Sequence, residues 1–197
     1  EIRGCGNILG AAQHGNIAAV GYDTYTLLIQ EAVAELKGQP VLRRALPPVE
    51  AAVDAFIPEQ YVPSEAQKIT LYKRISGARS VEEVHELHEE LADRFGTPPG
   101  PVQRLLGVMQ LRALGAEVGA KSIALTKTAV SVTFDSPRLL TRRLRNALIQ
   151  QFGDRAAFSW ENGPSIAFAL DAAGDPLATA RAFLEFLAHY ETHPRFD

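Results

Sequence analysis

Residues 121–135, KSIALTKTAVSVTFD, contain the change of apolar period that decides the fold class. Two short runs rich in apolar and β-branched residues, 121–126 and 129–134, flank a tight connection at Lys127-Thr128. Runs of this kind predict two short strands. The residues before them repeat their apolar positions at helical spacing instead, so the chain combines helices with a sheet.

The sequence before this stretch predicts one strand and three helices. The alternation in VEAAVDAFIP (49–58) predicts a strand that Pro58 ends. Capping-box patterns begin at SEAQ (64–67) and SVEE (80–83), and the prolines of TPPG (97–100) suit a first helical turn. The predicted helices cover about 65–78, 81 to Gly96, and TPPG to about Glu117.

The sequence after this stretch continues the mixed pattern. SPRLLTRRLRNALIQQF (136–152) predicts a helix capped by Ser136, with Pro137 in its first turn and Gly153 at its end. AAFSWENGPSIAFAL (156–170) predicts two strands joined by an Asn162-Gly163 turn, with Trp160 in the core. A closing helix follows. The order strand, strand, helix, strand, strand, helix predicts an α+β domain with helices packed on a small, mainly antiparallel sheet.

The first part of the chain predicts a helical appendage. Apolar residues recur at helical spacing over 17–37, and Gly38 ends the run. The connector GQPVLRRALPP (38–48) is rich in proline and glycine. We therefore expect an appendage over 1–47 and a compact domain over 48–197.

Composition limits the class of protein. The chain has 46% apolar residues and a formal net charge of −3, so its overall charge does not favour nucleic acid or an anionic membrane surface. Its single cysteine, Cys5, cannot form an internal disulfide, which is typical of a reducing cytoplasm. The sequence carries no signal-peptide pattern, and we expect a cytoplasmic piece of a longer polypeptide.

Two motifs suggest small ligands only weakly. The pattern Gly4-x-Gly6-x-x-x-Gly10 lacks the preceding strand of a dinucleotide site, and a structural loop is favoured. No GxxxxGK[ST] motif is present. In HELHEE, His85 and His88 lie three residues apart rather than the four of a zinc-protease pair, so a solvated charged face is favoured over a metal site. The residues thus predict no enzyme in this fragment, no metal and no cofactor of its own.

Two charged groups remain as candidate surfaces. Glu90, Asp93 and Arg94 share a helical face opposite an apolar stripe. The run RRLR (142–145) lies on a predicted helix over 138–149 and could contact phosphate, although an ordinary solvated face is the simpler interpretation.

The stretch EIRGCGNILGAAQHGNIAAVGYDTYTLLIQEAVAELKG (1–38) resembles the end of the second motor domain of bacterial transcription-repair coupling factors. Its first part also resembles the branch-migration helicase RecG. The resemblance to the coupling factors continues through FIPEQYVPSEAQKITLYKRISGARSVEEVHELHEELADRFGTPPGPVQRLL (56–106), which is similar to their C-terminal domain. The match covers most of residues 1–115, with Cys5 and His14 departing from the usual residues.

The resemblance implies roles for both parts of the chain. In the family, the glycine-rich loop belongs to a translocation motif that couples ATP hydrolysis to movement on double-stranded DNA, and its Arg and Gln correspond to Arg3 and Gln13. ATP and magnesium would be bound by motor domains outside this fragment. The parent protein would engage stalled RNA polymerase.

The C-terminal domain of this family is a regulatory domain. The resemblance implies that residues 48–197 fold back on the protein's own N-terminal module. There they would cover the surface that binds the excision-repair protein UvrA. Glu90, Asp93 and Arg94 are the residues we expect in this latch. The alternative is a stand-alone DNA-binding module that uses Arg142, Arg143 and Arg145. That alternative predicts DNA affinity that falls steeply with salt, whereas a purely regulatory domain predicts little.

Overall fold

The computed structural model describes residues 46–137, 140–161, 163–170 and 174–192. The predicted appendage lies almost entirely outside these residues, so the boundary at about Pro47 stays a prediction. In chain order the elements are β1 (Val49–Ala51), α2 (Glu65–Gly77), α3 (Val81–Phe95), α4 (Gly100–Glu117), β2 (Ala120–Leu125), β3 (Ala129–Phe134), α5 (Arg142–Phe152), a 3₁₀ turn (Gly153–Arg155), β4 (Ala156–Ser159), β5 (Ser165–Ala169) and α6 (Pro176–Thr192).

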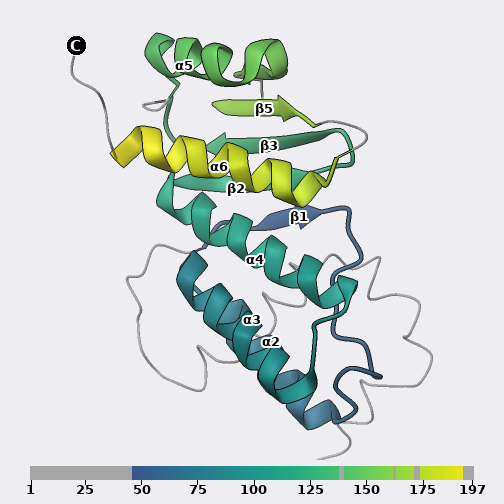
Figure 1. Ribbon diagram of the computed structural model, residues 1–197. Coiled ribbons are helices and arrows are strands. Elements are labelled where there is room, and N and C mark those ends of the chain that lie inside the picture. The colour runs from purple at the N-terminus through teal and green to yellow at the C-terminus, as the bar shows by residue number, and fades with distance from the viewer. Residues whose placement is uncertain (1–45, 138–139, 162, 171–173, 193–197) are drawn as a thin grey trace, which may run out of the picture.

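The strands form one five-stranded sheet in the order β1-β2-β3-β5-β4 (Figure 1). β1 pairs with β2 in parallel, and the other neighbouring strands pair antiparallel. Val132 of β3 lies between Ile123 of β2 and Ile166 of β5 in the register. The predicted α+β class, with helices packed on a mainly antiparallel sheet, is confirmed.

Helices α4 and α6 lie against one face of the sheet (Figure 1). Along β3, buried Val130, Val132 and Phe134 alternate with half-buried small residues, as the period of a strand requires. Phe168 of β5 stacks on Phe183 of α6 with ring centroids 4.8 Å apart. The main core therefore lies between the sheet and this helical layer.

Helices α2 and α3 form a second helical layer against α4, away from the sheet (Figure 1). Their predicted caps are confirmed: the Ser64 and Ser80 side chains accept hydrogen bonds from the backbone N–H groups of Gln67 and Glu83. Gly96 ends α3 with φ +82°, a conformation that favours glycine.

The chain enters the domain through a buried contact, which we call the entry seat (Pro47, Pro48, Arg112, Gly115 and Ile123). The Arg112 side chain is buried, and its Nε donates a hydrogen bond of 3.3 Å to the Pro47 carbonyl. The Ile123 N–H donates one of 3.0 Å to the Pro48 carbonyl. A Cβ on Gly115 would lie 3.0 Å from the Pro47 ring and 2.5 Å from Ile123. A side chain at this position would therefore require Pro47 and Ile123 to shift.

The strand predicted over 49–57 is shorter than expected. β1 ends at Ala51, which pairs with Leu125, the last residue of β2. Beyond that point no strand of the described chain continues beside it, because β2 has ended. The chain turns toward the helices instead, and the Ile57 N–H donates to the Tyr72 hydroxyl at 2.8 Å.

The predicted start of the fifth helix is wrong. α5 begins at Arg142, and Thr141 is its cap, with a side chain that accepts a hydrogen bond from the Leu144 N–H at 3.1 Å. Pro137 lies in a separate turn, closed by a 2.9 Å hydrogen bond from the Leu140 N–H to its carbonyl. Thr141 lies five residues after Ser136, so the helix begins later than predicted.

The prediction that Trp160 lies in the core is also wrong. β4 and β5 form as expected, but residues 160–164 join them and Ser159 pairs with Ser165. Trp160 lies past the last ladder pair, and 57% of its surface is exposed. The Trp160 side chain therefore does not belong to the buried face of the sheet.

Candidate interaction surface at the end of helix α3

An ion cluster joins the ends of α2 and α3. We call it the α2–α3 ion cluster; it consists of Arg74, Glu90 and Arg94. Both carboxylate oxygens of Glu90 accept hydrogen bonds from Arg74, at 2.6 and 2.5 Å. Arg94, one turn further along α3, donates to the same carboxylate at 2.7 Å. Glu90 therefore holds two guanidinium groups in fixed positions.

The electrostatics of the cluster favour the ionised carboxylate. Hydrogen bonds from Arg74 and then Arg94 lower the pKa of Glu90 from 4.5 to about 2. The hydrogen bond to Glu90 in turn raises the pKa of Arg74. Glu90 and Arg74 are therefore both charged at neutral pH.

Tyr61 braces the end of α3 from the loop before α2. Its hydroxyl lies 2.9 Å from the carbonyl oxygens of both Leu91 and Gly96, and its single hydrogen is shared between them. Its ring packs at 58° to the ring of Phe95, with centroids 5.8 Å apart. The Arg94 guanidinium lies over the Phe95 ring, 5.0 Å from its centroid. These contacts fix the helix end that carries the cluster.

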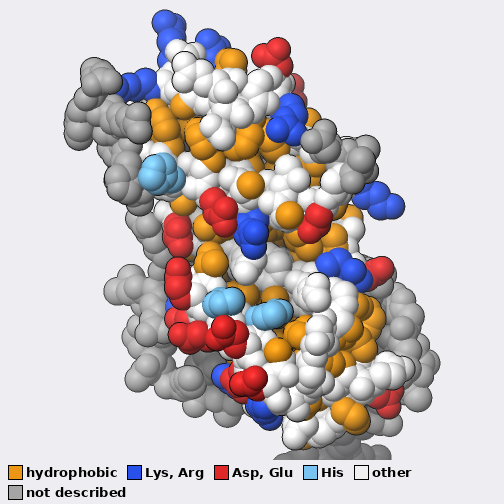
Figure 2. Space-filling view, viewed as in Figure 1, with side chains coloured by type: hydrophobic (Ala, Val, Ile, Leu, Met, Phe, Trp, Pro, Cys, Tyr) orange, Lys and Arg blue, Asp and Glu red, His pale blue; other side chains and the backbone are white. Residues whose placement is uncertain are grey.

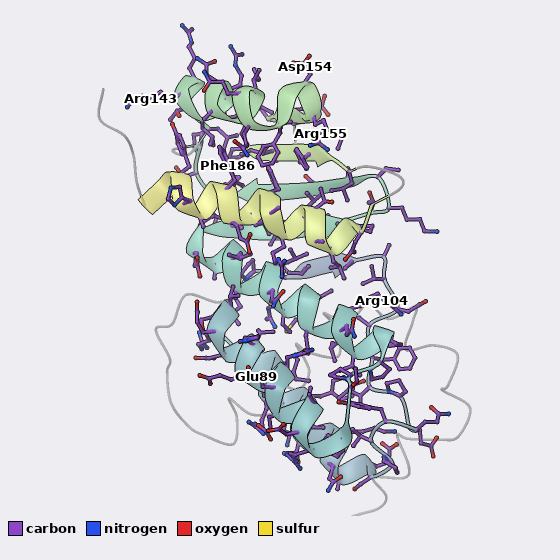
Figure 3. All side chains as sticks on the ribbon, in the orientation of Figure 1. Glu89, Arg104, Arg143, Asp154, Arg155 and Phe186 are labelled. Atoms are coloured by element: carbon purple, nitrogen blue, oxygen red, sulfur yellow. The ribbon has the colours of Figure 1, made fainter. Side chains whose placement is uncertain are left out.

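Asp93 belongs to a different flank of α3. With Glu82, Glu86 and Glu89 it follows spacings of four, three and four residues, which place these carboxylates along one ridge of the helix. All four side chains are exposed. Figure 2 shows acidic side chains gathered along this part of the molecule, and Glu89 of the ridge is labelled in Figure 3. We call these four residues the acidic ridge.

A shallow hollow of about 200 Å³ opens beside the ion cluster. Arg74 and Arg94 form its charged side, and apolar and small polar side chains of α2 form the rest. The lining residues are Ala66, Gln67, Thr70, Leu71, Arg74 and Arg94. It is large enough for one side chain of a partner rather than for a cofactor.

The histidines of the HELHEE run lie on the opposite flank of α3, toward α4. They line a groove of about 360 Å³ together with Val84, Gln103, Leu106, Gly107 and Gln110. His85 lies 3.4 Å from Glu89 and forms an ion pair with it when protonated. Within the described residues, no group of three or more His, Cys, Asp or Glu side chains is placed to hold a metal ion.

The structure brings Glu90 and Arg94 together and leaves Asp93 on the neighbouring ridge. Arg3 and Gln13 lie outside the described residues. Arg142, Arg143 and Arg145 are exposed on α5, away from α3. Sequence reasoning missed Arg74, which is 16 residues from Glu90. A contact between two helices leaves no local spacing signal.

Comparison with known proteins gives consistent matches. The family model for the TRCF domain matches residues 51–144. A transcription-repair-coupling factor of Myxococcus xanthus is 40% identical over 146 residues, which cover 71% of this chain and 12% of that protein. One from Bacillus subtilis (strain 168) is 38% identical over 133 residues, covering 67% of this chain and 11% of that protein. The chain thus matches only about an eighth of the length of these relatives.

The fold also has a solved counterpart. A crystal structure of the C-terminal domain of a transcription-repair coupling factor superposes with a TM-score of 0.66 at 20% identity. The match covers 79% of this chain and all of that one. Within the described residues, no helix is long and apolar enough to cross a membrane.

Proposed function

This chain carries the C-terminal domain of a transcription-repair-coupling factor, and from that premise we propose that the domain is a releasable latch inside a DNA-translocating ATPase. In the closed state it covers the UvrA-binding surface of the protein's own N-terminal module and restrains the motor. Engagement of stalled RNA polymerase by the parent protein opens the latch. UvrA then binds the uncovered surface.

The observation that carries this proposal is the charged end of α3. A latch must release, so its contact needs only a modest coupling energy, on the order of 1–3 kcal/mol. Polar contacts between domains suit that range better than a large apolar interface. The α2–α3 ion cluster offers oriented charges near the end of α3, the acidic ridge extends along the same helix, and the hollow beside Arg74 and Arg94 accepts one side chain.

Asp93, Glu90 and Arg94 have different roles in the proposed latch. Asp93 is exposed and forms no hydrogen bond or ion pair within the described residues. This free carboxylate supports the proposal that it pairs with a basic side chain of the N-terminal module. Glu90 holds Arg74 and Arg94 in position. Arg94 lies at the rim of the hollow, where it can pair with an acidic group of the partner.

The first residues of the chain have the motor role in this proposal. Arg3 can pair with a carboxylate or a phosphate through its planar fork, and Gln13 can exchange hydrogen bonds as the loop changes state. They would couple ATP hydrolysis to translocation on double-stranded DNA. ATP and magnesium would be bound by motor domains outside this chain, which itself would not be an enzyme.

The test is a binding measurement between this chain and the separately made N-terminal module, with UvrA as competitor. Asp93→Arg should lower the affinity about tenfold, which corresponds to about 1.4 kcal/mol. Asp154→Arg is the matched control, because Asp154 is also exposed but lies beyond α5 (Figure 3). In a full-length protein, Asp93→Arg should raise UvrA affinity. Wild-type UvrA affinity in that variant would contradict the latch.

A further inference from the structure

We propose that a second surface, at the start of α5, binds single-stranded nucleic acid. The surface consists of an arginine patch (Arg142, Arg143 and Arg145) and the exposed ring of Trp160. It lies on α5 and the β4–β5 turn, whereas the latch lies on α2 and α3 (Figure 1). The two surfaces can therefore be tested separately.

The arginine patch occupies the first turn of α5. All three side chains are exposed, and the helix contains no acidic residue. Arg142 and Arg145 are followed at helical spacing by Ile149, a large apolar residue that is 44% exposed. Figure 2 shows basic side chains together with some acidic ones at this end of the molecule, and acidic side chains gathered along α3.

The position of the patch is electrostatically unfavourable in the free domain. The N-terminus of a helix carries partial positive charge, so cations there are repelled both by the helix and by one another. The Thr141 cap satisfies the Leu144 N–H but adds no negative charge. A phosphate bound at this point would relieve the repulsion, whereas an uncharged partner would not.

Trp160 supplies the second element of the surface. At 57% exposure, it is the most exposed large apolar side chain in the described residues. An indole ring in water offers a flat apolar face without sequence preference, and aromatic faces of this kind stack on unpaired bases. The arginines alone would fit many anions; the ring favours nucleic acid.

The fold brings these two elements to the same end of the sheet. The Phe134 N–H at the end of β3 donates to the Pro164 carbonyl of the β4–β5 turn at 2.8 Å. The chain then needs only residues 135–141 to reach α5. Figure 3 places Arg143 at one end of α5 and Arg155 near the other. β4 follows Arg155, contacts α5 and runs antiparallel to β5, whose arrow points toward the Arg155 end in Figure 1. β4 therefore runs back toward the end of α5 that carries the arginines, and Trp160 directly follows β4.

The other charges at this end leave the surface basic. Lys121 lies 3.4 Å from Asp135, and these two charges offset each other. Glu161, next to Trp160, is the remaining described carboxylate on the β4–β5 turn. Among the described residues of this surface, arginines therefore outnumber carboxylates. A single strand fits this arrangement better than a duplex, because bases stacked inside a duplex do not reach an exposed ring.

The experiment uses the whole 197-residue chain, in which Trp160 is the single tryptophan, so its fluorescence reports this site alone. The probe is a fifteen-nucleotide oligo-dT, titrated at several salt concentrations, with anisotropy and tryptophan emission recorded together. We expect quenching of the emission on binding. Arg142→Gln with Arg145→Gln should weaken binding and lower the log-log salt slope by about 1.4. Trp160→Leu should weaken binding about tenfold at an unchanged salt slope.

The control variant is Lys73→Gln with Arg79→Gln, which removes the same charge from exposed positions at the other end of the domain. It should bind like the wild type, and circular dichroism should show that all variants are folded. Equal loss in this control, absence of quenching, or a poly-glutamate peptide that binds as tightly as oligo-dT would overturn the proposal. A duplex that binds as tightly as the single strand would also overturn it.

Discussion

Glu90→Gln tests how much the α2–α3 ion cluster stabilises the domain. The variant replaces the carboxylate by a neutral amide of nearly the same shape. A carboxyl whose pKa falls from 4.5 to about 2 on folding would gain roughly 3 kcal/mol at neutral pH if water did not screen the pair. Both arginines are 46% exposed, so we reduce this to about 1–2 kcal/mol.

The stabilisation has a defined pH window. Glu90 is more acidic in the folded chain than in the unfolded one, so its contribution is complete above about pH 4.5 and is lost as the pH falls through about 2. The variant should therefore be less stable than the wild type at pH 7. The difference should shrink steadily between pH 4.5 and pH 2.

Urea unfolding followed by circular dichroism measures this difference, because urea adds no ionic strength. Glu89→Gln is the matched control: it makes the same chemical change one residue away, at a side chain that is 67% exposed. We expect the control to change stability by less than about 0.5 kcal/mol. Equal stabilities of the two variants at pH 7, or a difference that persists at pH 2, would refute the reasoning.

Three further predictions concern the brace, the corrected cap and the end of α3. Tyr61→Phe should lower the free energy of unfolding by about 1–2 kcal/mol, since two backbone carbonyls lose their shared donor; urea titration measures it. Thr141→Ala should lower the free energy of unfolding by about 1 kcal/mol, and Ser136→Ala should lower it much less, as measured by urea titration. A larger loss for Ser136→Ala would indicate that the helix begins at Ser136 after all. Gly96→Ala should cost about 1 kcal/mol because of its positive φ, whereas Gly77→Ala, with open space around it, should be neutral or stabilising in a thermal melt.

Local signals predicted the helices of the second layer well. Ser64, Ser80 and Gly96 act within one turn of their own helix ends, so the printed sequence contains everything that fixes those ends. The same holds for β2 and β3, whose connection is only a few residues long. The boundaries of these elements agree with the structure to within one or two residues.

The errors arise where the deciding contact is distant in the sequence. The alternation over 49–57 is real, but a strand needs a partner, and β2 ends at Leu125. The exposure of Trp160 depends on where β4 leaves the sheet. The start of α5 was predicted from Ser136 alone, whereas the Thr141 side chain forms the cap.

The candidate site shows the same division. Glu90 and Arg94 are four residues apart on one helix, and their pairing is visible in the sequence. Arg74 reaches Glu90 from another helix, and the Tyr61 hydroxyl lies 30 and 35 residues from its two acceptors. Only the packing of α2 against α3 shows that one carboxylate serves two arginines.

The entry seat also has a mechanical consequence. Tension that reaches the domain from the N-terminal side meets the Pro47 and Pro48 carbonyls first, and they are tied to α4 and β2. A pull along β1 loads the parallel ladder in shear, so its hydrogen bonds resist together, whereas a sideways pull opens them one at a time. The domain would therefore resist a lengthwise pull on the chain before β1 and yield more easily to a sideways pull on it.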